Sequence, residues 1–229
     1  MTDIPDFRAF EHAGWEQVAQ QYHDAFATLT SQSVDPLLDA AGVRSGARVL
    51  DVATGPGYVA AAAARRGAAV VGVDFSLVMI RQAQHLHPGI DFREGDAEAL
   101  PFPEAGFDAV VMSFGLLHLG RPEQALAEAR RVLTSGGRLA FTVWAQPEEA
   151  VAFGIVLRAI TDHGNPNVPL PAGPPFFRFS DPEECRRVLL AVGFAAPRVT
   201  PVPQVWRLPA PAALFDAMAH GTVRTAALL

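Results

Sequence analysis

The sequence reads Arg-Val-Leu-Asp-Val-Ala-Thr-Gly-Pro-Gly at residues 48–57. Residues 48–53 form a short β-rich run with Val49, Leu50 and Val52, which predicts a strand, and the glycines that follow allow a sharp turn of the backbone. An alanine-rich segment at residues 59–66 comes next, and Gly67 marks the end of the helix that it predicts. The order is therefore strand, glycine turn and helix.

The same alternation continues along the chain. Predicted strands cover residues 48–53, 69–73, 90–93, 107–114 and 138–144. Strands separated by helices cannot be joined by hairpins, so the predicted fold is α/β, a doubly wound, mostly parallel sheet with helices on both faces. Ligands of such folds bind beyond the carboxyl ends of the strands, where we therefore look for the site.

The remaining segments predict a single domain with additions at both ends of the core. Helical spacing is seen at residues 11–30, 34–41, 76–85 (with Ser76 as cap), 122–133, 148–162, 180–191 (with Ser180 opening a capping box) and 211–229. The expected organisation is an N-terminal helical cap at 1–42, a cofactor-binding core at 43–145, a helical and proline-rich lid insertion at 146–196, and a C-terminal strand and helix at 197–229.

Composition narrows the class of partner. The net charge is −6, every basic residue is an arginine, and no basic stripe with interleaved aromatics occurs, which argues against a nucleic-acid partner. Cys185 is the only cysteine, so we expect a reduced, cytoplasmic setting. Residues 1–6 do not resemble a signal peptide, no apolar run reaches the length of a membrane span, and the histidines show no metal-binding spacing. The abundance of alanine, arginine and proline suggests a bacterial source, and the oligomeric state stays open.

Acidic residues follow three successive predicted strands. Asp51 ends the first strand, where a carboxylate suits a cofactor with a cationic amino-acid end and repels a pyrophosphate. Asp74 ends the second strand, where an acid can accept hydrogen bonds from both hydroxyls of a ribose. Asp96 follows the third strand, where an acid can accept from an adenine amino group. Together they describe a nucleoside that carries a positive group and no phosphates.

Each feature also has a simpler interpretation. Gly55 and Gly57 fit a plain tight turn, and with Ala60 they fit the dinucleotide pattern of nicotinamide enzymes. Asp74 alone fits a cap of the next helix, and Asp96 alone fits a turn or helix cap. Only their order and spacing as a set favours the nucleoside.

The set resembles the class I S-adenosylmethionine-dependent methyltransferases, and in particular the branch of ubiquinone and menaquinone biosynthesis. The resemblance rests on residues 51–57, 71–76, 95–103, 107–111 and 131–138, and covers about residues 34–144. It implies S-adenosylmethionine as cofactor, lying over the first strand. The implied cofactor contacts are Asp51, Ala53, Gly55, Gly57, Asp74, Phe75, Met79, Asp96, Ala97 and Ser113.

The resemblance implies transfer of a methyl group to an O, N or C atom of a small molecule. His118 follows the fourth strand and is the candidate general base, although it also fits a histidine packed beside the next helix. An already acidic acceptor needs no base. Trp15, Tyr22 and Phe26, with Phe176 and Phe177, are candidates for an apolar substrate pocket, and each ring taken alone fits plain packing better.

Two other functions stay open. One is a cofactor-binding protein of methyltransferase fold that transfers no methyl group, and the other is an NAD(P)-dependent oxidoreductase. We further expect residues 163–177 to be part of a lid, hinged at Gly164 and Gly173. Residues 197–208 supply a credible sixth strand, but no second β-branched run follows, so we expect the seventh strand of the family to be missing because the chain is truncated.

Overall fold

A computed structural model describes residues 6–165 and 167–229. One sheet forms its centre, in the order β3-β2-β1-β4-β5, and all four strand pairs are parallel. The strands are β1 (Arg48–Val52), β2 (Ala69–Asp74), β3 (Asp91–Glu94), β4 (Phe107–Ser113) and β5 (Leu133–Thr142). The predicted parallel α/β sheet is confirmed, and the strand order reverses between β1 and β4, where such folds bind ligands.

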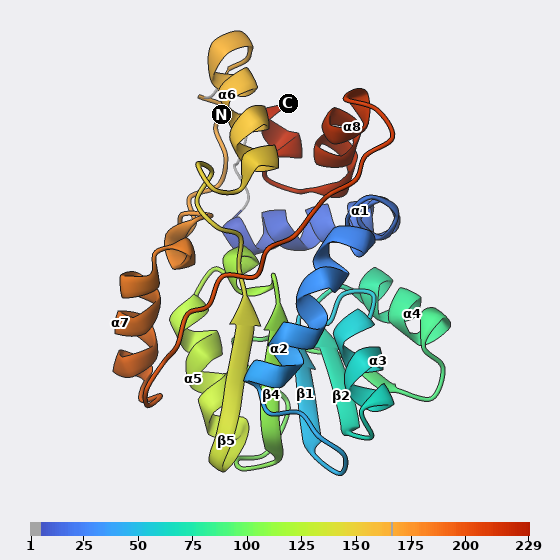
Figure 1. The fold of residues 1–229 in the computed structure, drawn as a ribbon, viewed down its shortest axis with the longest axis vertical. Helices are drawn as coiled ribbons and strands as arrows, with labels where there is room; N and C mark the ends of the chain where they lie inside the picture. The colour runs from blue at the N-terminus through green and yellow to red at the C-terminus, as the bar shows by residue number, and fades with distance from the viewer. Residues whose placement is uncertain (1–5, 166) are drawn as a thin grey trace.

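Helices cover both faces of the sheet (Figure 1). They are α1 (Phe7–Thr30), α2 (Val34–Ala40), α3 (Tyr58–Arg65), α4 (Leu77–Leu86), α5 (Pro122–Val132), α6 (Val151–His163), α7 (Pro182–Val192) and α8 (Ala212–Gly221), with 3-10 turns at η1 (Ser31–Ser33), η2 (Leu116–His118), η3 (Arg178–Ser180) and η4 (Ala226–Leu228). Successive residues of a strand point to opposite faces. Leu50 accordingly packs with the α5 side of the core, and Val49 packs with the α2 and α3 side.

The N-terminal part of α1 does not lie on a face of the sheet. It crosses above the carboxyl ends of the strands, and α8 lies above it (Figure 1). A separate apolar cluster joins α1, α6 and α8 through Phe26, Phe153, Ile160 and Met218. The carboxyl ends of the strands are thus enclosed between the sheet below and this upper layer.

The prediction of a sixth strand at residues 197–208 is wrong. The segment is extended but joins no sheet, and it runs from α7 to α8 (Figure 1). Pro197, Pro201 and Pro203 lack the N–H groups that a strand needs. The segment is instead fixed at Val205, whose N–H and carbonyl both bond to the side chain of Gln32. Within the described residues β5 is an edge strand, with β4 on one side and no strand on the other.

Smaller differences concern element ends. Strand β5 begins at Leu133, earlier than predicted, because the chain pairs with Phe107 before a register shift at the Gly136 turn. Ser76 caps α4 as predicted, accepting from Met79 N. Ser180 does not cap α7: its hydroxyl donates to the carbonyl of Trp144, and Asp181 is the N-cap. Residues 164–165 and 167–177 are irregular, and Pro166 of the predicted lid loop lies outside the described residues, as do residues 1–5 of the predicted N-terminal cap.

Candidate functional site

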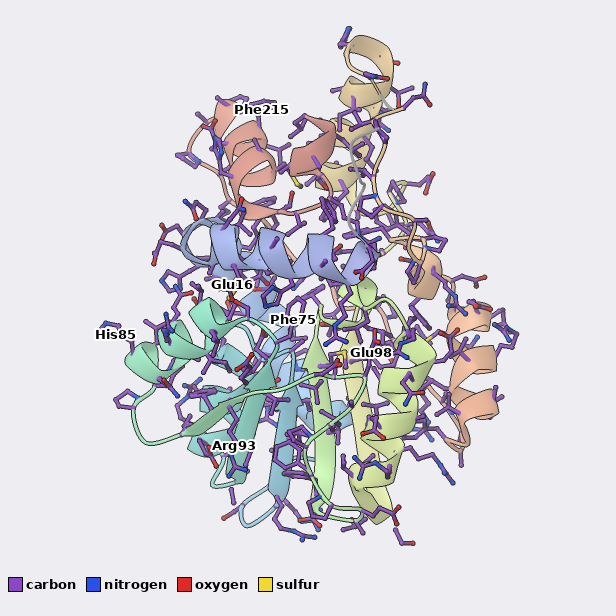
Figure 2. All side chains as sticks on the ribbon, turned by 180° about the vertical axis from the view of Figure 1, so that it is seen from behind. Glu16, Phe75, His85, Arg93, Glu98 and Phe215 are labelled. Carbon is purple, nitrogen blue, oxygen red and sulfur yellow. The ribbon has the colours of Figure 1, made fainter. Side chains whose placement is uncertain are left out.

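A pocket lies between the carboxyl ends of the strands and α1. Most of the predicted cofactor residues line it: Ala53, Gly55, Asp74, Phe75, Met79, Asp96, Ala97 and Ser113. His118 lines it as well, whereas Asp51 and Gly57 lie behind its wall. Phe75 and Glu98 are both found beneath α1 (Figure 2). The sheet topology therefore brings residues from four strand ends into one cavity.

The two glycines of the β1–α3 turn differ in what they do. Gly55 has a φ of +52°, and a Cβ there would meet nothing within 4 Å, so its open side leaves bare backbone along the pocket. Gly57 has a φ of +83°, and its Cβ would lie 2.7 Å from Cζ of Phe92. Gly57 is therefore required by the packing of the turn against β3, while Gly55 allows a ligand to approach the chain.

Asp51 is turned into this loop and is fully buried. One carboxylate oxygen accepts from the hydroxyl of Thr54 and from the N–H of Ala60. The other oxygen has no hydrogen-bond partner within the described part of the chain. Burial raises the pKa of Asp51 to about 7, against which the Thr54 and Ala60 bonds act. Asp51 thus stabilises the turn through its bonds to Thr54 and Ala60, and a positive charge nearby would favour its ionised form.

Asp74 holds the other side of the same turn. Its two oxygens accept from the backbone N–H groups of Gly55 and Ser76, each at 2.9 Å. Burial raises the pKa of Asp74 to about 6, opposed by these bonds and assisted by the charge of Glu16. Each carboxylate oxygen can accept more than one hydrogen bond. Asp74 can therefore hold the loop and still accept from a ligand in the pocket.

Asp96 and the residues around it form the next part of the wall. Its Oδ1 accepts from the N–H of Glu98, and its Oδ2 lies 2.8 Å from the guanidinium of Arg8 on α1. Phe75 packs edge-to-face against His12, also on α1. Met79 and Ala97 are buried. This arrangement offers apolar surface for a flat ring beside an acidic group that has a cationic neighbour.

His118 ends η2 and faces the pocket from the side of β4. Its Nδ1 lies 2.9 Å from a carboxylate oxygen of Glu11, and its ring meets the Trp15 ring edge-on. Glu11 is fully buried on α1 and also binds Arg224, with 2.6 Å between Nε and Oε1.

The sequence analysis missed both Glu11 and Arg224. Glu11 lies four residues before Trp15 on the buried stripe of α1 that continues through Tyr22 and Phe26. A carboxylate on an apolar helix face is the sequence feature that marks it. No comparable pattern marks Arg224.

Aromatic rings make up the far side of the pocket: Trp15, Tyr22, Phe26, Phe114, Trp144, Phe153 and Phe176. Phe114 stacks on Trp144, with 4.1 Å between ring centroids. Phe177 does not line the pocket but packs against Phe153 behind it. Both arginines of the lining are engaged by acids, Arg8 by Asp96 and Arg224 by Glu11. The aromatic side thus offers a neutral apolar surface with one imidazole.

Comparison with known proteins agrees with this geometry. Residues 50–141 match a family model described as methyltransferase domain. The demethylmenaquinone methyltransferase of Renibacterium salmoninarum is 46% identical over 111 residues, which are 48% of this chain and 47% of that protein. The demethylmenaquinone methyltransferase of Deinococcus radiodurans is 37% identical over 165 residues, which are 64% of this chain and 67% of that protein. The chain belongs to the class I S-adenosylmethionine-dependent methyltransferase family.

Several matches to curated methyltransferases span about half the length of those relatives, as the Renibacterium example shows. A solved methyltransferase structure from Thermotoga maritima superposes with a TM-score of 0.58 at 21% identity, covering 80% of this chain and 81% of that one. At this identity the match supports the class I methyltransferase fold. Within the described residues, no helix combines the length and the apolar character that crossing a membrane requires.

Proposed function

We propose that this methyltransferase transfers a methyl group from S-adenosylmethionine to a neutral, flat small molecule bound against the aromatic side of the pocket. The observation that carries the proposal is the division of the pocket, with Asp74 and Asp96 on one side and the aromatic rings with His118 on the other. The acidic side suits a cationic nucleoside, and the aromatic side suits an uncharged ring. The protein is proposed to act in the cytoplasm, in keeping with its single cysteine.

The residues present fit S-adenosylmethionine. Asp74 would accept from the ribose hydroxyls, Asp96 from the adenine amino group, and Phe75 and Met79 would pack on the adenine. The open side of Gly55 and the buried carboxyls of Asp51 and Asp74 favour a cationic ligand close to the chain. When bound, the cofactor supplies an activated methyl group, so the chain has to align the acceptor and exclude water.

His118 is the proposed base for a hydroxyl acceptor. Its Nε2 would take the proton that a hydroxyl acceptor loses on methylation. Two other ionisable groups line the pocket near His118, Tyr22 and Glu98, and neither is suited to accept this proton. Burial raises the pKa of Tyr22 to about 12, so its phenol stays protonated at neutral pH, and the Glu98 carboxylate is bonded to the N–H and guanidinium of Arg121.

The names of the curated relatives support a ring-bearing acceptor of quinone type, because both describe enzymes that act on demethylmenaquinone. The lack of an unpaired cation in the pocket lining supports an acceptor without a carboxylate or phosphate group near the reacting atom. A quinol or phenol meets both conditions.

Calorimetry with S-adenosylmethionine and with NADH tests the cofactor, and we expect binding of the first alone. Formation of S-adenosylhomocysteine is then measured over a panel of quinols and phenols. In the His118→Ala variant we expect turnover to fall by roughly 10²–10⁴-fold with unchanged cofactor affinity. Cofactor binding without product on a broad panel would favour the non-catalytic alternative, and unchanged turnover in the variant would return His118 to a packing role.

A further inference from the structure

Glu11 lies behind the pocket lining, next to His118 and Trp15, and its side chain has no exposed surface. Its Oε2 accepts from Nδ1 of His118 at 2.9 Å and from the indole N–H of Trp15 at 3.1 Å. Its Oε1 accepts from Nε of Arg224 at 2.6 Å. Three donors from α1, η2 and the segment after α8 thus converge on one carboxylate.

The carboxylate is ionised in this setting. Burial alone would raise the pKa of Glu11, but the charges and hydrogen bonds of His118 and Arg224 hold the pKa below its ordinary value, and the permanently cationic Arg224 keeps its part of this effect when His118 is neutral. Arg224 is fixed in turn, because its remaining nitrogens donate to the carbonyls of Pro174 and Leu117 and its guanidinium lies over the Phe7 ring. Arg224 therefore balances Glu11 and is not free to bind an acceptor.

An ionised carboxylate can only accept hydrogen bonds, so Nδ1 of His118 must carry a proton. In the neutral imidazole the lone pair is then on Nε2. Nε2 has no hydrogen-bond partner among the described residues, and the ring lines the pocket. The arrangement orients the free lone pair of His118 toward the aromatic side.

We propose that Glu11 is a positioning residue, which fixes the tautomer and ring orientation of His118 so that Nε2 is the basic atom, while Arg224 keeps Glu11 ionised. The inference rests on the proposed function in so far as His118 is the base. The same logic operates wherever a buried acid orients a catalytic histidine, and replacing such an acid by its amide disables the histidine through the wrong tautomer.

Glu11→Gln is the test variant, since it preserves size and removes the charge. Its amide oxygen is expected to face the cationic Arg224, which leaves the NH₂ group facing Nδ1 of His118 and drives the proton to Nε2. Glu128→Gln is the matched control, because Glu128 resembles Glu11 in accepting from an arginine, but its other partner is the backbone N–H of Leu100 and it neither contacts His118 nor lines the pocket.

Nitrogen-15 NMR of the imidazoles reads the tautomer directly, with the His118 signals assigned by their loss in His118→Gln. We expect the Nδ1–H tautomer in the wild type and in Glu128→Gln, and the Nε2–H tautomer in Glu11→Gln. With an acceptor from the panel, kcat should fall by about 10²–10⁴-fold in Glu11→Gln with KM within threefold, as for loss of a correctly oriented base. Affinity for S-adenosylmethionine should not change.

An Nε2–H tautomer in the wild type would overturn the proposal, and this measurement stands even if Glu11→Gln fails to fold. So would a Glu11→Gln variant that keeps wild-type kcat, or one that loses only cofactor affinity. Failure of the proposed function is a separate outcome. In that case the wild type forms no S-adenosylhomocysteine, and the tautomers of the wild type and Glu11→Gln alone decide the role of Glu11.

Discussion

Asparagine in place of Asp74 keeps the size of the side chain and removes its charge. In the native protein the two oxygens of Asp74 accept from the N–H groups of Gly55 and Ser76, and burial raises the pKa from its ordinary value of 3.8 to about 6. At neutral pH we therefore expect the substitution to maintain or raise the stability of the free protein while it weakens cofactor binding, and we expect the sign of the stability effect to change with pH.

The magnitudes follow from these contacts. At pH 7.5 Asp74 is ionised in the native state. Because its pKa there is about 6 and not 3.8, this ionisation lowers the free energy of unfolding by about 3 kcal/mol, and asparagine removes that cost. Asparagine leaves one of the two N–H groups facing an NH₂ group, which costs about 1–3 kcal/mol. The variant should therefore be as stable as the wild type at pH 7.5, or more stable by up to about 2 kcal/mol.

The sign reverses in acid. A carboxyl with a raised folded pKa stabilises the fold below its unfolded pKa, and this contribution is lost as pH rises from about 3.8 through about 6. At pH 4 the penalty is nearly absent, so the variant should be less stable than the wild type by about 1–3 kcal/mol. Affinity for S-adenosylmethionine at pH 7.5 should drop by about 1.5–3 kcal/mol, or about ten- to 150-fold, because a charge-assisted bond to the ribose is lost.

Urea unfolding at pH 4 and 7.5 measures the stability, and calorimetry measures the affinity. Asp108→Asn is the control of opposite sign, because hydrogen bonds from Arg48 lower the pKa of the exposed Asp108 to about 2 and its contribution to stability is present at neutral pH. A stability deficit of Asp74→Asn that grows from pH 4 to 7.5 would refute the assignment of a desolvated carboxyl. Wild-type cofactor affinity would refute the ribose contact.

Three further predictions concern the same region and the predicted lid at residues 163–177. The wild type should lose stability as pH rises from about 3.8 to about 7, and Asp51→Asn should reduce this loss. Urea unfolding across this range measures the loss, and an unchanged slope in the variant would argue against a buried carboxyl with one oxygen unbonded. Gly57→Ala should lower the free energy of unfolding by at least about 1 kcal/mol more than Gly46→Ala does, as measured in urea. Both residues have a positive φ, but only the Cβ at Gly57 would collide with Phe92, and equal losses in the two variants would count against this collision. Limited proteolysis at residues 163–177 should slow when cofactor and acceptor are both bound, whereas equal cutting with and without ligands would exclude a lid.

The sheet and its helices could be predicted because the sequence patterns that specify them are short and continuous. Buried strands, glycine turns and acids at strand ends each occupy a few consecutive residues, and a parallel sheet brings their carboxyl ends together. Asp74, Asp96 and Ser113 therefore line the pocket as the strand pattern implied. Asp51 shows where local information ends, since the direction of its side chain depends on Thr54 and Ala60 across the turn.

Two features depended on information that the sequence analysis did not use. The strand predicted at residues 197–208 does not form, because Pro197, Pro201 and Pro203 lack the N–H groups that pairing with a neighbouring strand requires. The Glu11 cluster was missed because its donors come from positions far apart, with His118 at 107 residues and Arg224 at 213 residues from Glu11. Ion pairs between residues so far apart in the sequence produce no periodic sequence pattern from which they could be predicted.

That long span also has a consequence for how the chain is made. During synthesis, strands β1 to β5 leave the ribosome well before Arg224 exists, and α1 with Glu11 is made before either. Seating α1 at that stage would bury the Glu11 carboxylate without its arginine, at a cost of several kcal/mol. Doubling a loop from about 107 to about 213 residues adds only about 0.6 kcal/mol of closure entropy, so the late arrival of Arg224 is not a thermodynamic obstacle once it is made. The nascent protein is thus expected to form its sheet before its pocket closes, which leaves the aromatic wall open to chaperones until Arg224 has been made.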